Sequence, residues 1–247
     1  MASIDVVIPV LNEEQALPGC IDTLREFLGA ELGQHQWRVV IADNGSEDGT
    51  LDVARRYAQQ YPANLAYIHL DVRGRGRALR RAWLESEADM VSYMDVDLST
   101  ELEAFPAMAH AIIEEGYDVA YGSRLVKAAE IERSFKRDMI SRMYNSIIKL
   151  SMRTRFSDAQ CGFKALSRGA ARTLVPAVVN NHWFFDTELL IIAEKRGFRL
   201  KEVPVKWKED PDTRVKIAQT VMEDLKGLAR LRFSGIPKVE RPGYGQQ

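Results

Sequence analysis

Residues 4–14 read IDVVIPVLNEE, and this stretch decides how the first half of the chain folds. Its first seven residues are mostly apolar and β-branched, which predicts a buried strand over 4–10. The polar residues NEE follow, and apolar residues then recur on one face of a predicted helix from about Gln15 to Leu28. A buried strand, a polar loop and a helix together form the first half of a crossover unit, which joins parallel strands.

The same alternation of strands and helices continues to residue 95. It predicts strands at 37–43, 65–70 and 90–95, and helices at 50–60 and 78–87. Repeated crossovers predict an α/β fold with a mainly parallel, twisted sheet flanked by helices. Ligands of such sheets bind beyond the carboxyl ends of the strands. The polar clusters of this half follow the strands at that edge, at Asn12 and Glu13, at Asp43 and Asn44, and at Asp95 and Asp97.

The second half of the chain is less regular. It contains a predicted strand at 118–124, a basic helical stretch at 133–155, a loop at 156–166, a helix at 185–197 and a strand at 200–207. Over residues 217–233 apolar residues recur at helical spacing, with Lys226, Arg230 and Arg232 between them. This pattern fits a helix packed on the sheet and also fits an interfacial helix whose basic side meets anionic headgroups.

Composition limits the classes of function. The chain has 247 residues, 46% of them hydrophobic, which is typical of one globular domain with a buried core. Its formal net charge is −1, so no overall positive field indicates nucleic acid as a partner. Cys20 and Cys161 do not form a C-x-x-C pair, which favours a reducing cytoplasm. We find no leader peptide and no window apolar enough to span a bilayer, and therefore expect a cytoplasmic protein that can still touch a membrane.

The stretch YMDVDLST (93–100) sets Asp95 and Asp97 one residue apart at the end of a predicted strand. This spacing suits a hard cation, since Mg²⁺ or Mn²⁺ takes one or two carboxylates together with substrate phosphate oxygens. In the alternative interpretation the aspartates cap the next helix, and Ser99 with Glu103 also fits a capping box. The carboxylates after the first two strands favour the cation site, because all these groups would then share one edge of the sheet.

Five segments of the first half together resemble the family 2 glycosyltransferases of the GT-A fold. They occur in the order expected for that family and read PVLNEE (9–14), DNGSEDGT (43–50), RGRGRAL (73–79), DVD (95–97) and GSR (122–124). The resemblance implies a Rossmann-like core that binds a nucleotide sugar. The segment RGRGR alone fits an anion-binding loop and fits a flexible surface turn almost equally well.

The second half resembles the branch of that family that loads sugars onto dolichyl or other polyprenyl phosphates. The resembling segments are DAQCGFKAL (158–166), WFFDTELL (183–190) and the basic stretch RDMISRMYNSI (137–147). QCGFK combined with FDTEL is closer to dolichyl-phosphate β-glucosyltransferases than to mannosyl enzymes, whose loop more often reads TSGFR. The resemblance implies a catalytic domain over 1–217. Residues 218–247 would then form an amphipathic helix and a tail, which we expect to be disordered because it has little apolar content.

The resemblance also implies roles for individual residues. It assigns the nucleotide sugar to Pro9, Asn12, Glu13, Asp43, Gly45, Arg77, Asp95, Arg214 and Lys216. It assigns a Mg²⁺ or Mn²⁺ ion to Asp95 and Asp97, and the acceptor to Arg124, Arg137, Asn145, Gln160 and Glu188. The residues expected to act in the reaction itself are Asp95, Asp97, Arg124, Gln160 and Asp186. The segment DTRVK, which contains Arg214, lacks the glycine that is usual in the family's closing segment.

The implied reaction moves a hexose, glucose before mannose, from UDP-glucose or GDP-mannose to a polyprenyl phosphate, with inversion at the anomeric carbon. The acceptor needs no strong general base, because a phosphate monoester with a second pKa of about 6 is largely ionised at pH 7. Positive charge is needed instead, so that the acceptor phosphate can approach the donor diphosphate although both are anions. A lipid acceptor also implies peripheral binding to the cytoplasmic face of a membrane.

Three other functions fit parts of the sequence. A GT-A transferase could act on a non-lipid acceptor, such as a glycan or a small molecule. A nucleotidyltransferase would need a G-x-G-T-R-L-type loop where PVLNEE stands. A non-catalytic binding protein with the same fold would have no need of the paired aspartates together with the basic residues.

Overall fold

The computed structural model describes residues 1–132, 135–208 and 217–243, without the side chains of residues 132–137 and 217–219. The strands are β1 (Ser3–Val10), β2 (Gln36–Asp43), β3 (Leu65–His69), β4 (Met90–Met94), β5 (Val119–Ser123), β6 (Glu130–Glu132), β7 (Phe163–Ser167), β8 (Leu200–Pro204) and β9 (Lys206–Lys208). The α-helices are α1 (Ala16–Glu31), α2 (Thr50–Gln60), α3 (Arg75–Glu85), α4 (Phe105–Ile113), α5 (Phe135–Met152), α6 (Arg168–Leu174), α7 (Phe185–Lys195) and α8 (Ile217–Phe233). Short 3₁₀ turns, Leu102–Ala104 and Val175–Ala177, adjoin α4 and α6.

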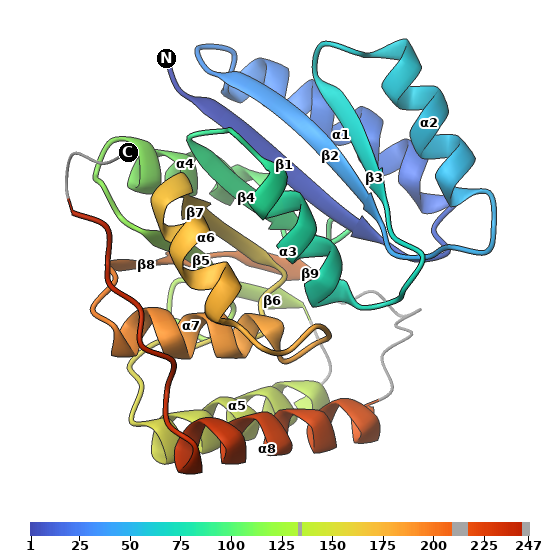
Figure 1. Cartoon of the computed structure of the whole chain (residues 1–247). Helices are drawn as coiled ribbons and strands as arrows, with labels where there is room; N and C mark the ends of the chain where they lie inside the picture. The colour runs from blue at the N-terminus through green and yellow to red at the C-terminus, as the bar shows by residue number, and fades with distance from the viewer. Residues whose placement is uncertain (133–134, 209–216, 244–247) are drawn as a thin grey trace.

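The main sheet has the strand order β3-β2-β1-β4-β7-β5-β8 (Figure 1). Its neighbouring strands are parallel except that β7 runs antiparallel to both β4 and β5. The short strands β6 and β9 pair with each other in a second sheet. The predicted α/β fold with a mainly parallel sheet flanked by helices is therefore confirmed.

Alternating side chains divide the core into two halves, one on each face of the sheet. Along β1, Ile4, Val6 and Ile8 belong to the half covered by α1, α2 and α4, whereas Val7 belongs to the half covered by α3, α6 and α7. This is the two-residue period of a strand that is buried on both faces. The apolar stretch IDVVIPV (4–10) thus supplies side chains to both halves of the core.

Helices α5 and α8 form a further layer outside α7 (Figure 1). Leu228 and Leu231 on the inner side of α8 are buried with Ile148 of α5 in the same half of the core as α7. Gly227 brings α8 close to α7, since a Cβ there would meet the ring of Phe184. The inner side of α8 therefore packs on α5 and the start of α7 and not on the sheet, as one of the two interpretations of residues 217–233 had it, and membrane contact of the outer side stays a prediction. In the described parts of the chain, no helix has the combination of length and apolarity needed to cross a bilayer.

Predicted element boundaries were wrong in several places. The predicted loop 156–166 contains the start of β7, which is inserted in the middle of the sheet. The predicted strand at 200–207 is divided into β8 and β9, which belong to different sheets. Helix α3 begins at Arg75, three residues before the predicted start, because its first turn is built from the polar segment RGR.

The C-terminal tail, expected to be disordered, contacts the domain up to Pro242, and residues 244–247 lie outside the described part of the structure. Val239 and Ile236 contact the core half that contains α7. Arg241 forms an ion pair of 2.6 Å with Asp118, and Arg196 donates a hydrogen bond of 2.7 Å to the Pro237 carbonyl. The absence of a long apolar run hid these contacts, because most of them are made by charged side chains and backbone carbonyls.

Candidate active site

Part of the set predicted to bind the nucleotide lies together, because β1, β2 and β3 are parallel and end in register. Asp43 is paired with Val10 on one side and with His69 on the other, and Pro9 is half-buried just before the end of β1. The Asp43 carboxylate is fully buried, with its Oδ2 2.5 Å from the His69 Nδ1. Its Oδ1 accepts a hydrogen bond from the Ser46 amide at 3.3 Å. These contacts fix Asp43, and they identify His69 as a site residue that the sequence analysis missed.

The loops after β1 and β2 are hydrogen-bonded to each other. The Asn12 side chain accepts a hydrogen bond from the Glu47 amide at 2.8 Å, and the Glu13 amide donates to the Thr50 hydroxyl at 2.7 Å. Gly45 has a φ of 76°, in the left-handed region that glycine adopts without strain. The two loops therefore form one preformed wall beside Asp43.

A tight turn at the end of β4 carries the predicted metal ligands. The Leu98 amide donates to the Asp95 carbonyl at 3.1 Å, and Leu98 itself has a positive φ of 48°. The Asp97 Oδ1 accepts a hydrogen bond from the Ser99 amide at 3.0 Å. The 3₁₀ turn and α4 that follow have no side-chain cap, so the capping box considered above is not formed. The turn sets both carboxylates beyond the end of the strand.

Arg75, the first residue of α3, connects Asp95 with Asp186 at the start of α7. Its Nη2 lies 2.7 Å from the Asp95 Oδ1, and its Nη1 lies 2.6 Å from the Asp186 Oδ2. The guanidinium also lies over the rings of Tyr93 and Trp183, at 4.7 and 5.1 Å from their centroids. Burial opposes the charged form, but Tyr93, Asp95 and Asp186 outweigh it and raise the pKa of Arg75. Because its side chain is only 11% exposed, Arg75 is not part of a flexible surface turn.

A buried lysine on β7 completes this cluster. The Lys164 Nζ donates to the Cys161 carbonyl at 2.6 Å and lies 3.5 Å from the Asp186 Oδ1. Its side chain is fully buried, so Asp186 is flanked by two enclosed cations, Arg75 and Lys164. The sequence analysis missed Lys164 because it interpreted this segment as a loop, where a lysine is usually solvated.

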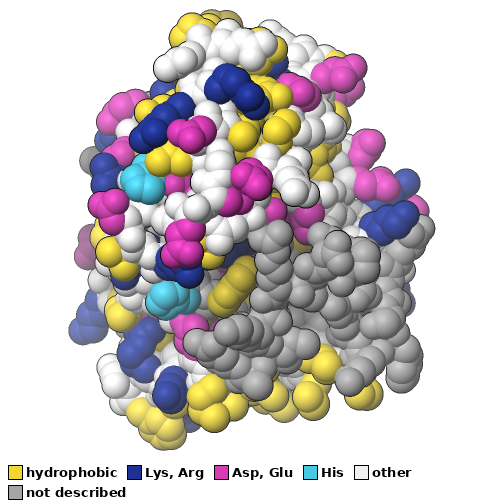
Figure 2. All heavy atoms as spheres, turned by 90° about the vertical axis from the view of Figure 1, so that its right-hand side faces the viewer, with side chains coloured by type: hydrophobic (Ala, Val, Ile, Leu, Met, Phe, Trp, Pro, Cys, Tyr) yellow, Lys and Arg dark blue, Asp and Glu magenta, His cyan; other side chains and the backbone are white. Residues whose placement is uncertain are grey.

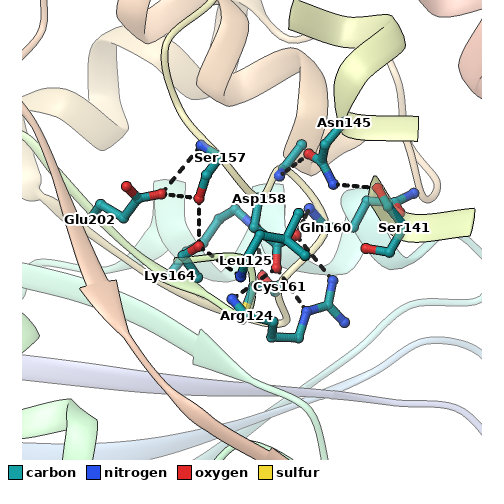
Figure 3. A network of polar contacts seen from close by, with 12 residues as sticks. Arg124, Leu125, Ser141, Asn145, Ser157, Asp158, Gln160, Cys161, Lys164 and Glu202 are labelled. Atoms are coloured by element: carbon teal, nitrogen blue, oxygen red, sulfur yellow. Dashed lines mark hydrogen bonds and ion pairs between the residues drawn. The ribbon is translucent and has the colours of Figure 1, made fainter. Parts of the chain in front are cut away.

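Arg124 forms an ion pair inside the protein (Figure 3). Its Nε and Nη2 lie 2.8 and 3.0 Å from the two carboxylate oxygens of Asp158, which is fully buried. Burial favours a raised pKa for Asp158, but the Arg124 charge outweighs it and lowers the pKa. On the other side of the loop, the Asn145 side chain accepts a hydrogen bond from the Ala159 amide at 2.9 Å. Arg124 and Asn145 therefore both hold the loop 158–162, and a direct contact of either residue with an acceptor stays a prediction.

Gln160 lies at the centre of that loop and reaches α8. Its Nε2 donates a hydrogen bond of 3.2 Å to the Asp224 Oδ2. The Asp224 side chain is buried, and burial raises its pKa to about 7. The loop predicted to line the sugar and acceptor is thus connected to the outermost helix of the fold.

Two predicted site residues lie apart from this cluster. The fully buried Glu188 accepts hydrogen bonds from the Val179 and Asn180 amides at 3.1 and 3.0 Å, and its Oε2 lies 2.8 Å from the Arg230 Nη2. The Arg77 Nη1 donates to the Arg73 carbonyl at 2.9 Å, within its own loop. These contacts indicate supporting roles in the surrounding loops. The other predicted residues, Arg214, Lys216 and the side chain of Arg137, lie outside the described part of the structure.

The donor set at the β4 turn fits a hard divalent cation. Asp95 and Asp97 offer carboxylate oxygens, and the Asp95 side chain is 45% exposed despite its contact with Arg75. In the described residues no group of three or more metal-binding side chains is present. Two carboxylates suffice for Mg²⁺ or Mn²⁺ when substrate phosphate oxygens complete the coordination.

Comparison with solved structures defines the class of this fold. The chain matches glucosyl-3-phosphoglycerate synthase from Mycobacterium tuberculosis with a TM-score of 0.70, over 96% of this chain and 80% of that chain, at 18% sequence identity. This match establishes the GT-A fold of the nucleotide-sugar transferases. The sequence profile of Glycosyl transferase family 2 matches residues 5–175, and the chain belongs to that family.

Relatives with described activities are similar over most of this chain. Glycosyltransferase AglD of Haloferax volcanii is 36% identical over 89% of this chain and 35% of its own length. Dolichyl-phosphate beta-glucosyltransferase of Drosophila melanogaster is 31% identical over 83% of this chain and 67% of its own length. The corresponding protein of Dictyostelium discoideum is 28% identical over 96% of this chain and 77% of its own length. The chain therefore spans about a third of AglD and two thirds to three quarters of the two glucosyltransferases.

Proposed function

We propose that this chain transfers a hexose from a nucleoside diphosphate sugar to the phosphate of a polyprenyl phosphate, with inversion at the anomeric carbon. Glucose is the favoured sugar and mannose the next, from UDP-glucose or GDP-mannose. The names of the dolichyl-phosphate beta-glucosyltransferases support both the sugar and the lipid acceptor. The observation that carries the proposal is Arg75, enclosed between Asp95 and Asp186. The Arg75 guanidinium can release a carboxylate and bind the donor diphosphate in its place. The buried positive charge of Arg75 then always has an anionic partner.

A Mg²⁺ or Mn²⁺ ion held by Asp95 and Asp97 would supply positive charge to the diphosphate leaving group. A solved structural neighbour, glucosyl-3-phosphoglycerate synthase, is described in complex with Mn²⁺ and uridine diphosphate. We assign the nucleoside to the wall formed by Asp43, Glu13 and the Asn12 loop. Carboxylates accept hydrogen bonds from base and ribose donors, and Asp43 already lies fixed in that wall.

The acceptor phosphate oxygen forms the new bond to the anomeric carbon while the bond to the donor diphosphate breaks, and the nucleoside diphosphate leaves. No side chain has to remove a proton, because the phosphate monoester is already ionised near neutral pH. Arg75 and Lys164 keep positive charge beside the reacting groups, and Asp186 between them can accept a hydrogen bond from a sugar hydroxyl. The enzyme's own contribution is therefore orientation and charge, not proton transfer.

The acceptor lipid requires contact with a membrane, and the outer layer offers a surface for it. Helices α5 and α8 expose the apolar side chains Met139, Met143, Leu150, Val221, Met222, Leu225 and Phe233. Figure 2 shows hydrophobic side chains along this lower edge of the molecule. Exposed basic residues flank them at Lys149, Arg153 and Arg232. An apolar surface with basic neighbours suits the interface of an anionic bilayer, so we propose that the protein is peripheral on the cytoplasmic face.

An activity screen tests the proposed reaction. UDP-glucose, GDP-mannose and UDP-N-acetylhexosamines are each supplied with a short polyprenyl phosphate, with a small phosphate monoester, or with no acceptor, in Mg²⁺ or Mn²⁺. We expect transfer of glucose to the polyprenyl phosphate, and loss of that transfer in Asp95→Asn. Transfer only to the small phosphate monoester would replace the lipid by a soluble acceptor.

Vesicle flotation tests the membrane contact. The variant Leu150→Glu/Phe233→Glu places charge on two side chains that are 82% and 87% exposed, so its folding should be unaffected. Wild type should float with vesicles that contain anionic lipid, and the variant should not. Leu84→Glu, on an exposed apolar side chain of α3, is the control and should float like wild type. Equal flotation of all three proteins would contradict this surface.

A further inference from the structure

One buried carboxylate of the outer helix has no role in the proposed reaction. Asp224 lies on the inner side of α8, 1% exposed, with the buried Leu228 and Leu231 one and two turns further on. Its Oδ1 accepts no hydrogen bond from any described residue. A carboxylate is costly to bury, and an apolar side chain of similar size often serves packing equally well. Packing alone therefore does not explain an aspartate here.

The contacts of Asp224 lead to the loop 158–162. Its Oδ2 accepts the hydrogen bond from the Gln160 Nε2, across 64 residues of sequence. The Tyr144 hydroxyl of α5 is hydrogen-bonded to the Thr187 hydroxyl of α7 at 3.1 Å, and Tyr144 also interacts with Asp224. Asp224 thus joins α8 to three parts of the structure that surround the site: the loop 158–162, α5 and α7.

The hydrogen bond decides which way the Gln160 amide faces. A side-chain amide has a donor end and an acceptor end, and the Asp224 Oδ2, which acts as an acceptor here, takes a hydrogen bond only from the donor end. With Nε2 turned to Asp224, the Gln160 Oε1 has no hydrogen-bond partner among the described residues. That oxygen is left to accept a hydrogen bond from a hydroxyl group of a bound ligand.

We propose that Asp224 is a positioning residue that orients the Gln160 amide, so that α8 sets the acceptor-site geometry. The inference rests on the proposed function, in which the loop 158–162 lines the sugar and acceptor. It adds a coupling, since Val221, Met222 and Leu225 of the same helix form part of the proposed membrane surface. If the outer side of α8 binds the membrane, its inner side keeps Asp224 in the position that orients the Gln160 amide.

Kinetics of matched variants test this role. Asp224→Leu fills the site without an acceptor atom, and Asp224→Asn keeps one. We expect Asp224→Leu to unfold at no lower temperature than wild type, yet to lower kcat/KM for the acceptor about tenfold, the effect of one hydrogen bond to a charged group. KM for the donor should change less than twofold. Asp224→Asn should recover most of the loss, and Glu223→Gln, next to it on α8, should behave like wild type.

A double variant separates orientation of Gln160 from a general packing effect. If Asp224 acts through Gln160, Asp224→Leu/Gln160→Ala will be no slower than Gln160→Ala alone. Losses that multiply in the double variant, or an Asp224→Leu variant with normal acceptor kinetics, would overturn the proposal.

A spectroscopic readout is independent of the acceptor's identity. The side-chain amide signals of Gln160, assigned in ¹⁵N-labelled protein by their loss in Gln160→Ala, should shift strongly in Asp224→Leu and little in Glu223→Gln. Unchanged signals in Asp224→Leu would overturn the proposal even if the enzyme is active. If wild type does not act on polyprenyl phosphate but the signals shift as expected, the proposed acceptor is wrong and the orientation of Gln160 by Asp224 stands.

Discussion

Gly162 lies against the side chain of Asp95, one of the predicted metal ligands. A Cβ at this position would lie 1.7 Å from the Asp95 Oδ2 and 2.5 Å from its Cγ. The backbone of the loop therefore approaches the carboxylate as closely as a residue without a side chain allows. Glycine is required here by the space between β7 and the β4 turn, not by an unusual φ angle.

We expect Gly162→Ala to displace the Asp95 side chain and to weaken Mn²⁺ binding at least tenfold, with a comparable or larger loss of transfer. Mn²⁺ titration followed by electron paramagnetic resonance measures the first effect without substrate. Gly19→Ala on α1 is the control, because no atom lies within 4 Å of its Cβ position and alanine favours a helix. Normal Mn²⁺ affinity in Gly162→Ala would contradict a metal site at Asp95.

A second prediction concerns the enclosed side chain of Arg75. Arg75→Gln leaves Asp95 and the buried Asp186 without their shared cation, so we expect the free energy of unfolding to fall by about 3 kcal/mol. Transfer should fall at least about 100-fold, as for loss of a donor that stabilises developing negative charge. Chemical denaturation and initial-rate assays check the two effects. Arg81→Gln, which breaks only an exposed pair with Glu85 on the same helix, should change stability by less than about 0.5 kcal/mol.

Candidate site residues that directly follow strands could be found from the sequence. Candidate residues whose partners are distant in sequence were harder to find. Asp43, Asp95 and Asp97 were predicted because a parallel sheet brings strand ends to one edge. Lys164 was missed, and Arg75 was named only within the segment RGRGR, because their role depends on Asp186, and Arg75 and Asp186 are 111 residues apart. In sequence alone, a charge paired over that distance cannot be distinguished from a solvated one.

At the scale of elements, β7 shows where periodicity was insufficient. The strand is five residues long and reads FKALS, with Lys164 at its centre, so neither its length nor its polarity marked it as central. Its partners, β4 and β5, lie far from it in sequence. By contrast, β1, β2 and α2 were predicted within about one residue, because each has a long run at a single period.

Helix α8 predicts a pH dependence of stability. The pKa of Asp224, about 7 in the folded protein, lies above the value of about 3.9 expected in the unfolded chain. The folded state therefore holds this proton more tightly, and the stability it contributes at low pH is lost as pH rises through 7. The negative charges of Glu223 and Asp186 raise this pKa further, whereas the interaction with Tyr144 lowers it.

Asp224→Asn removes this titration. We expect the unfolding midpoint of Asp224→Asn, measured relative to wild type, to rise between pH 5 and pH 8. Thermal unfolding followed by circular dichroism over that range measures the difference. Asp52→Asn, which removes an exposed carboxylate on α2, should show no such trend, and a constant offset between Asp224→Asn and wild type would exclude a raised pKa.

At the scale of the whole molecule, the C-terminal tail joins elements that are distant in the fold. Arg241 meets Asp118 just before β5, and Ile236 and Pro237 accept hydrogen bonds from Arg196 at the end of α7. The tail, which has few apolar residues, thereby links the end of α7 to the start of β5 in the sheet. Composition predicted disorder because it counts apolar residues and cannot register ion pairs made with distant elements.

Truncation tests this fastening. A chain that ends at Ser234 loses the contacts of Ile236, Val239 and Arg241, and we expect a loss of about 2 kcal/mol. For a domain of this size that corresponds to a melting temperature lower by about 4–8 °C. A chain that ends at Gly243 keeps every described contact of the tail and should melt like the full chain. Equal melting of both truncations would show that the tail contributes nothing to stability.

The antiparallel strand β7 also governs the order in which the sheet can be completed during synthesis. We expect β4 to be able to pair with β1 once residue 94 has left the ribosome, whereas its partner on the other edge, β7, is made about 70 residues later. At translation rates of about 5–20 residues per second, that edge stays unpaired for about 4–14 s. Throughout this interval the nascent chain exposes the backbone of MVSYM, which makes the ribosome-bound half-sheet a substrate for chaperones and a risk for aggregation.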